Sequence, residues 1–305
     1  CMKLAEATPE DVHTLIPPIL DRIRMIWNIS LHYNTHERVT SLLRKVSNEI
    51  ISRCCANIHL EQIFNENVFS AMSALERSIQ CSAEWRKLYK KTVAAIERST
   101  RDASKHWTFK EASIFAQIEA FTRRCRDLLE VCEGQVQFTR RKPNGNQIDM
   151  PVFGGTRGPH IYKSLCDNEK VFAMHLEKLR TLDYDALDVR ATRWHEDFNT
   201  QFKNSLRDLE VMTQNIINTA FNNVSTVAGG VELLEAFQVL AWCESIKRCV
   251  EKKVTDVLSS FIKQCAQYKR HFESNRHAPP VHPDEPKNGG GADWTSGLRR
   301  EIAQD

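Results

Sequence analysis

The chain has 305 residues, enough for one large domain or two of ordinary size with a sizeable core. Hydrophobic residues make up 41% of it and charged residues 27%, which is typical of a folded soluble protein and excludes a disordered one. No apolar run approaches the roughly 18 residues of a membrane-spanning helix, and the well-mixed net charge of +3, from 42 basic and 39 acidic residues, argues against nucleic acid as a partner.

Glycine and proline are absent from residues 19–133, 160–228 and 231–278 and gather between these stretches. Long segments without helix breakers predict an all-α fold of long helices joined by loops. Because a helix of about 40 residues is about 60 Å long, we expect elongated antiparallel bundles with coiled-coil-like packing. The predicted organisation is a first helical bundle over residues 1–133, a Gly/Pro loop over 134–158, a second bundle over 159–275, a Pro/Gly linker over 276–294 and the start of a further helix over 295–305.

The first predicted helix starts near Thr8, which precedes Pro9 at a favourable first helical position. Residues 15–29 are apolar on more than one side, so we expect this helix to be buried between others. The polar, acidic start of the chain does not resemble a signal peptide. Cys1 and Asp305 look like the ends of a piece cut from a longer polypeptide.

Two further helices are predicted before residue 101. Thr35 is a suitable N-cap for a helix that ends near residue 57. A second helical run covers residues 60–100, but its apolar residues keep only a loose phase. We therefore expect a break in it near residues 81–84.

Residues 108–133 carry the most regular helical pattern. Thr108 and Glu111 form a capping box at its start, and Gly134 suits the left-handed position after its end. Apolar residues at steps of three, four and seven place one stripe on this helix: Ile114, Phe115, Ile118, Phe121, Cys125, Leu128, Leu129 and Cys132.

Two more apolar seams follow in the C-terminal half, and each predicts a long, packed helix. The first consists of Trp194, Phe198, Phe202, Leu206, Leu209, Met212, Ile216 and Ala220. The second, interrupted near residues 243–247, consists of Leu233, Phe237, Leu240, Val250, Val254, Val257, Phe261, Cys265 and Tyr268.

The ten cysteines include no pair at C-x-x-C spacing, which excludes zinc-ribbon and thioredoxin-like sites. Most occupy apolar positions of the helical patterns, where a free cysteine behaves as a small hydrophobic residue. We interpret them as reduced core thiols of a cytosolic-type compartment.

Two segments resemble catalytic or ligand motifs, and both favour plain structural interpretations. The glycine-rich loop at residues 154–158 could cradle an anion, but it lacks the ending of a Walker loop and no strand precedes it. His195 and Glu196 resemble part of a zinc-protease helix, but position 199 is Asn rather than the second His. We therefore predict no catalytic, cofactor-binding or metal-ligating residue.

Candidate partner contacts are Trp107, Phe109 and Trp294, because they lie at the edges of predicted elements rather than in the middle of a seam. Burial in the core is the alternative for each. Two short basic clusters, at residues 123–126 and 140–142, fit solvated surface or protein contact better than phosphate binding.

Several sequence motifs appear in order along nearly the whole chain: residues 24–27 (RMIW), 33–35 (YNT), 113–121 (SIFAQIEAF), 123–128 (RRCRDL), 184–185 (YD), 187–188 (LD), 208–210 (DLE), 233–234 (LL), Phe237, 279–280 (PP), Trp294, Leu298 and 299–302 (RREI). Together they resemble the N-terminal tail, or stem, of dynein heavy chains. Residues 47–51 with Cys54 and Cys55, and residues 209–215, are most similar to the axonemal type, in particular to one heavy chain of the two-headed inner-arm dynein. The triple glycine at residues 289–291 departs from the more proline-rich linker of the family.

The resemblance implies a non-catalytic tail scaffold in a ciliary or flagellar axoneme. It implies as partners another dynein heavy chain, WD-repeat intermediate chains and docking proteins on doublet microtubules, with neither nucleic acid nor membrane. It places ATP in a motor far downstream and implies no cofactor here. The alternatives are an unrelated helical adaptor of the spectrin or catenin sort and an enzyme that binds a nucleotide at residues 154–158.

Overall fold

The computed structural model describes residues 11–65, 67–142, 146–222, 224, 226–240, 244–280 and 287–304. Within these residues no β-strand forms, and an isolated antiparallel bridge joins Arg141 to Gln147. The predicted all-α class built from helical bundles is therefore confirmed. The predicted helix start at Thr8 and Pro9 lies outside the described residues.

The chain divides into two compact units. Unit 1 comprises Cys1–Gln147 and Ala173–Ser205, and unit 2 comprises Ile148–Phe172 and Leu206–Asp305. The helices of unit 1 are α2 (Val12–Ile29), α3 (His36–Asn57), α4 (Leu60–Ile63), α5 (Val68–Ser99), η1 (Ala103–Lys105), α6 (Glu111–Thr139) and the π-helix η2 (His195–Phe202). Helix α7 (Gly158–Arg180) belongs partly to each unit, and α8 (Lys203–Phe221) begins at the end of unit 1 and lies mostly in unit 2. Unit 2 otherwise contains α9 (Val227–Gln238), α10 (Glu244–Asn275) and α11 (Lys287–Gln304).

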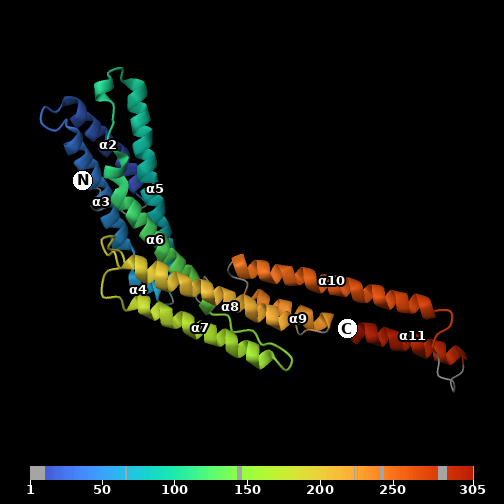
Figure 1. Ribbon diagram of the computed structural model, residues 1–305. Coiled ribbons are helices and arrows are strands. Elements are labelled where there is room, and N and C mark those ends of the chain that lie inside the picture. The colour runs from blue at the N-terminus through green and yellow to red at the C-terminus, as the bar shows by residue number, and fades with distance from the viewer. Residues whose placement is uncertain are drawn as a thin grey trace. The chain divides into compact units, whose positions relative to one another are not determined.

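Helices α5 and α6 are long antiparallel neighbours in unit 1, and α2 and α3 pack against them (Figure 1). Their direction follows from the ion pairs that join them. Lys90, late in α5, pairs with Glu111 at the start of α6, whereas Arg86, one turn earlier, pairs with Glu119 further along α6.

An aromatic cluster fills the core between these helices. Its members are Trp27, Trp85, Tyr89, Trp107, Phe109 and Phe115. Neighbouring rings lie 5.2–6.1 Å apart between centroids, within the range in which aromatic pairs attract. The indole N–H of Trp85 donates to Ser47 Oγ at 3.0 Å, so this buried polar group is satisfied. The cluster joins α2, α5 and α6, and the hydrogen bond to Ser47 ties α3 to the same core.

The start of α3 confirms one sequence prediction, and the burial of α2 corrects another. Thr35 caps α3, because its side chain accepts a hydrogen bond from the backbone N–H of Arg38. Helix α2 was expected to be covered on more than one side, yet its buried residues form a single stripe: Val12, Ile16, Leu20, Ile23 and Trp27. Met25 and Ile29 lie outside this stripe and are 59% and 73% exposed.

Three predictions about helix boundaries in unit 1 are wrong: the break in α5, the capping box at the start of α6, and the end of α6. Helix α5 continues through residues 81–84, since Ser78 and Ser82 donate from Oγ to carbonyls one turn earlier and so satisfy their polar groups inside the helix. Helix α6 begins at Glu111 without a side-chain cap and passes through Gly134, which is buried. Its last residue is Thr139, and Arg140, which follows, adopts the left-handed conformation expected of the glycine.

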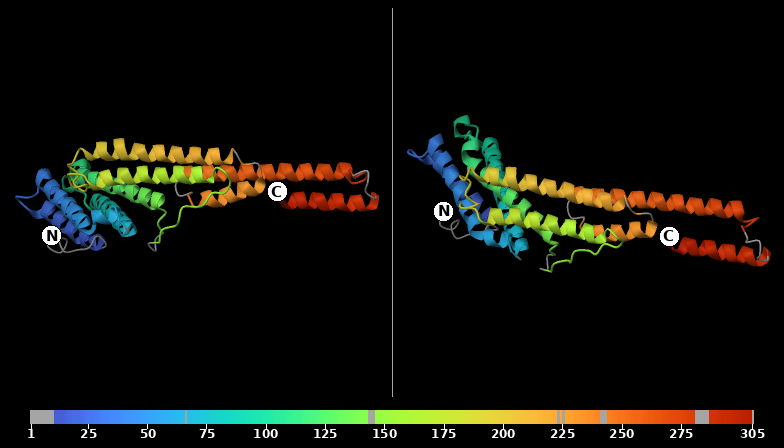
Figure 2. Two further views of the ribbon diagram at one scale, coloured as in Figure 1. Left: turned by 90° about the horizontal axis from the view of Figure 1, so that it is seen from below. Right: turned by 60° about the horizontal axis from the view of Figure 1, so that its bottom comes forward.

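In unit 2, α9 and α10 form a helical hairpin, and α11 turns back along the end of α10 (Figure 2). Thr226 caps α9 by accepting from the N–H of Gly229 at 3.2 Å. The core cluster of this unit consists of Phe153, Ile161, Leu165, Ile217, Ala220, Leu233, Phe237, Leu240, Ile246 and Val250.

The buried phase of α8 differs from the predicted seam. Met212 is 51% exposed, whereas Thr213 and Ile217 are buried. Thr213 can be buried because its hydroxyl donates to the carbonyl of Leu209 at 2.8 Å and accepts from Asn168 at 3.2 Å. A satisfied threonine therefore takes the core position that hydropathy assigned to methionine.

The second half of the predicted linker is helical. Residues 288–291, including the three glycines, belong to α11, which already begins at Lys287. Leu298 and the residues packed around Trp294 provide the tertiary contact that offsets the low helix propensity of glycine.

Candidate protein-interaction surfaces

The three aromatic residues predicted as partner contacts lie in different surroundings. Trp107 and Phe109 are 4% and 7% exposed within the aromatic cluster of unit 1, so little of either side chain remains to touch another protein. Trp294 is half-buried and stacks on Phe272 of α10, with ring centroids 5.9 Å apart and an interplanar angle of 7°. A partner contact through these residues remains a prediction.

Arg124 organises a polar network in unit 1 that the sequence did not reveal. Although it lies in a predicted surface cluster of basic residues, it is 7% exposed. Its guanidinium donates to the backbone carbonyls of Ala186, Asp188 and Ala191 and lies 4.7 Å from the centroid of the Trp194 ring. It therefore holds the segment between α7 and η2 against α6.

Asp127 completes this network by accepting a hydrogen bond of 2.9 Å from the indole N–H of Trp194. Burial raises the pKa of Asp127, while the Trp194 hydrogen bond and the charge of Arg124 oppose that effect. Burial also lowers the pKa of Arg124. Arg124 is buried and Asp127 is half-buried, so these hydrogen bonds form partly away from water, where they are stronger.

The segment that resembles part of a zinc-protease helix has a structural role in unit 1. It begins η2, where Trp194 stacks on Phe198 at 5.4 Å and Phe198 on Phe202 at 6.0 Å. His195 points to Asn199, whose Nδ2 lies 3.1 Å from its Nδ1. Among the described residues, no three His, Cys, Asp or Glu side chains are placed to hold a metal ion.

The glycine-rich loop at residues 154–158 has backbone reasons for two of its glycines. Gly155 has a φ of +74°, which L-residues rarely adopt. A Cβ on Gly158 would lie 1.9 Å from the carbonyl oxygen of Phe153, so no larger residue fits there without moving the backbone. These constraints explain the glycines as a tight turn into α7.

An apolar stripe runs along the exposed side of α10 in unit 2. It consists of Val254, Leu258, Phe261, Ile262, Cys265 and Phe272, and we call it the α10 stripe. The predicted seam places Val254, Phe261 and Cys265 in a bundle core, which is wrong because all three are exposed. Leu258 and Ile262 are 55% and 66% exposed. Clustered apolar surface of this kind is typical of a protein contact.

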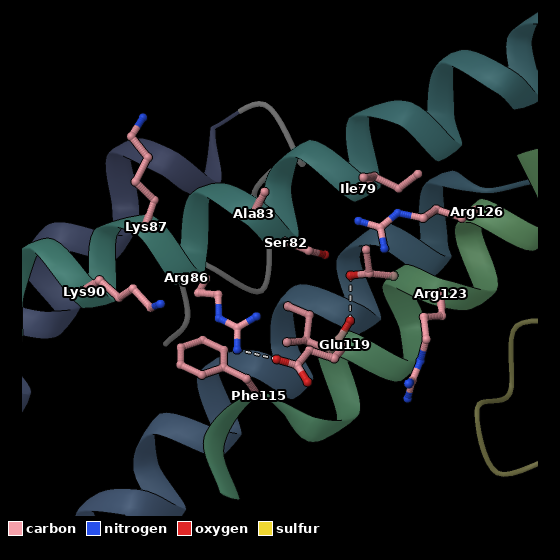
Figure 3. Close-up of a pocket in the computed structure, with 12 residues that line it drawn as sticks. Ile79, Ser82, Ala83, Arg86, Lys87, Lys90, Phe115, Glu119, Arg123 and Arg126 are labelled. Atoms are coloured by element: carbon pink, nitrogen blue, oxygen red, sulfur yellow. Dashed lines mark hydrogen bonds and ion pairs between the residues drawn. The ribbon is translucent and has the colours of Figure 1, made fainter. Parts of the chain in front are cut away.

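A groove of about 720 Å³ lies between α5 and α6 on unit 1 (Figure 3). Its cations come from both helices: Arg86, Lys87, Lys90, Arg123 and Arg126. Glu119 is the one carboxylate that lines it, and it pairs with Arg86. The sequence revealed only the cations of α6, which form a basic cluster at residues 123–126. Those of α5 lie at residues 86–90 and come close to α6 only in the fold.

No helix among the described residues is long and apolar enough to cross a membrane.

The whole chain, residues 1–305, matches the family model for dynein heavy chain, N-terminal region 1. It is 44% identical over 304 residues to the Dynein-1-beta heavy chain of the flagellar inner arm I1 complex of Chlamydomonas reinhardtii, covering 100% of this chain and 6% of that protein. It is 30% identical over 300 residues to human Dynein axonemal heavy chain 2, covering 98% and 5%. The Dynein-1-alpha heavy chain of the same algal I1 complex is 28% identical over 250 residues, covering 82% and 5%. The chain thus spans about one-twentieth of the length of these relatives.

Proposed function

The chain belongs to the dynein heavy-chain family as part of the N-terminal tail of the axonemal type, and from this premise we propose that it is a non-catalytic scaffold. In this proposal the segment joins its heavy chain to another heavy chain and to WD-repeat intermediate chains. It thereby helps to anchor the motor on a doublet microtubule in the axoneme of a cilium or flagellum. ATP hydrolysis belongs to a downstream motor in the same proposal.

The α10 stripe is the observation that carries this proposal. Its members recur at steps of about one helical turn on one side of α10, the pattern by which one helix packs against another. Two relatives of this chain, the alpha and beta heavy chains, carry the name of one I1 complex. We therefore assign the α10 stripe to contact with a helix of a second heavy chain.

A pull-down from an extract of isolated cilia tests this proposal. The tagged 305-residue chain should recover dynein heavy or intermediate chains, identified by mass spectrometry. Changing Leu258→Glu together with Phe261→Glu places two charges in the α10 stripe and should abolish recovery of the heavy chain. Ser259→Glu with Ala266→Glu adds the same charge to an exposed, less apolar face of α10 and should leave recovery unchanged. Recovery of the heavy chain by the stripe variant would contradict the assignment. If the unmodified chain recovers neither heavy nor intermediate chains, the scaffold function is contradicted.

The other two hypotheses have less support. A family match over the whole chain favours a dynein tail over an unrelated adaptor of the spectrin or catenin sort. The backbone requirements of Gly155 and Gly158 account for the glycine-rich loop without a nucleotide. Equilibrium binding of labelled ATP to the 305-residue chain should show no saturable component, and saturation would revive the enzyme hypothesis.

A further inference from the structure

We propose that the groove between α5 and α6 binds an acidic amphipathic helix from another polypeptide of the dynein complex. We call it the α5/α6 groove, defined by Arg86, Lys87, Lys90, Arg123 and Arg126 with Ile79, Ala83 and Glu119. The proposal deepens the scaffold function and rests on it, since it adds a second contact surface on unit 1.

The charge of the α5/α6 groove is only partly neutralised by the chain itself. Arg86 is held by Glu119, with Glu111 3.9 Å away, and Lys90 also lies 3.9 Å from Glu111. Lys87 pairs with Glu84 at 3.1 Å yet keeps 73% of its side chain exposed. An incoming carboxylate can therefore reach the amines of the α5 rim.

The α6 rim carries the cations with the fewest internal partners. Arg123 and Arg126 are both exposed, and no ion pair or hydrogen bond of either is found among the described residues. In Figure 3 Arg126 reaches from α6 toward α5, Arg123 projects from α6 away from α5, and Arg86 crosses from α5 over the ring of Phe115 to Glu119. Two free guanidinium groups on one rim favour bidentate contacts with carboxylates.

The dimensions fit a helical segment. The lining residues span positions 79–90 of α5 and 115–126 of α6, which is about 16 Å of each helix at 1.5 Å per residue. A third helix of about three turns can lie along such a groove. The partly exposed Ile79 and Ala83, with the aliphatic stems of the lysines, provide apolar contact for its inner face.

Protein carboxylates fit this site better than phosphates do. Both walls are the middles of helices, whose backbone N–H groups are already bonded within the helix, so no backbone amides face the groove as in phosphate sites. Glu84, Glu111 and Glu119 also interrupt the cations, whereas a nucleic-acid backbone prefers a continuous basic stripe.

Zero-length carbodiimide coupling in intact dynein particles from cilia tests the contact directly, because this reagent joins a lysine amine only to a carboxylate that touches it. Lys87 or Lys90 should couple to an Asp or Glu in a helical segment of another polypeptide. Couplings of Lys87 to Glu84 and of Lys90 to Glu111 within the chain serve as internal controls that the reagent reached the groove. If both lysines couple only within the chain, the proposal is overturned.

Charge reversal supplies the matched comparison. In full-length heavy chain, Arg123→Glu with Arg126→Glu should lower the yield of intermolecular coupling at Lys87 and Lys90 by about tenfold. The variant loses two exposed ion pairs with the partner helix and replaces them with repulsion between carboxylates. Lys91→Glu with Arg98→Glu reverses two exposed cations of α5 outside the groove and should leave it unchanged. Unchanged coupling in the first variant would overturn the proposal, as would binding of labelled single-stranded DNA by the 305-residue chain that is lost in that variant.

The same particles separate this proposal from the scaffold function. If residues elsewhere in the tail couple to other subunits while Lys87 and Lys90 do not, only the groove proposal fails. If no residue of the tail couples to any other subunit, the scaffold function fails as well.

Discussion

Replacing Arg124 with Met should destabilise unit 1 far more than the same replacement at its exposed neighbour Arg123. The guanidinium of Arg124 donates three hydrogen bonds to backbone carbonyls and contacts the Trp194 ring. Methionine matches the aliphatic stem, so the change removes the hydrogen bonds and the cation–π contact without leaving a large cavity. It also removes the cation that most lowers the pKa of Asp127.

The expected loss is about 3 kcal/mol in the free energy of unfolding. Hydrogen bonds to a charged group contribute roughly 1.5–3 kcal/mol each, but the desolvation of the guanidinium, seen in its lowered pKa, offsets much of their sum. The cation–π contact adds about 1 kcal/mol. With a urea m-value of about 2–3 kcal/mol per molar, the midpoint for unit 1 should fall by about 1 M or more.

Urea titration followed by circular dichroism measures this loss, and hydrogen exchange locates it. Amides of residues 184–194 should exchange faster in Arg124→Met, because the carbonyls that Arg124 holds lie in this segment. Arg123→Met is the control. Because Arg123 is exposed, its replacement should change the free energy of unfolding by less than about 0.5 kcal/mol. Equal midpoints for the two variants would refute the role assigned to the buried guanidinium.

Three further outcomes are expected in the 305-residue chain. Gly158→Ala should lower the thermal midpoint of unit 2, because its Cβ would overlap a backbone carbonyl, whereas Gly154→Ala, with a nearest contact of 3.6 Å, should not; equal midpoints would contradict the clash. In native chain at pH 8, iodoacetamide should modify the exposed Cys265 well before Cys132, whose pKa burial raises to about 12, as mass spectrometry of timed samples would show; faster modification of Cys132 would contradict its burial. Burial raises the folded-state pKa of Asp127, so the charged carboxylate lowers the stability of the fold above that pKa, and this loss disappears as the pH falls through it. The wild type should therefore gain stability relative to Asp127→Asn between pH 7 and about pH 4. A difference in urea midpoints that stays constant over this pH range would contradict the prediction.

Helix existence was predictable because its signals are local. The absence of glycine and proline over long stretches and the N-cap at Thr35 depend on residues a few positions apart, and the corresponding helices form. Helix ends were less predictable, since they depend on tertiary contacts. Gly134 looks like a stop in sequence, but burial of α6 on both sides of it carries the helix on to Thr139.

The polar features of unit 1 were hidden for a related reason. Arg123 and Arg124 are adjacent residues of the same type, yet Arg123 is exposed and Arg124 is buried. What distinguishes them is the segment around residues 186–191, which approaches α6 only in the folded chain. The α5/α6 groove likewise requires two helices to meet before its cations form one surface.

The apolar seam of α10 shows where periodicity stops being informative. Ile246 and Val250 are buried against α9, while Val254 and Leu258, further along the same helix, are 40% and 55% exposed. The four-residue spacing is the same in the buried and the exposed part of the seam. An apolar stripe in a sequence indicates that a helix face packs against something, but it does not indicate which chain supplies the contact. The change from buried to exposed along one continuous seam is therefore information that only the fold supplies. It is also the reason that we propose the contact with a second heavy chain on the distal part of α10, where apolar side chains stay exposed among the described residues.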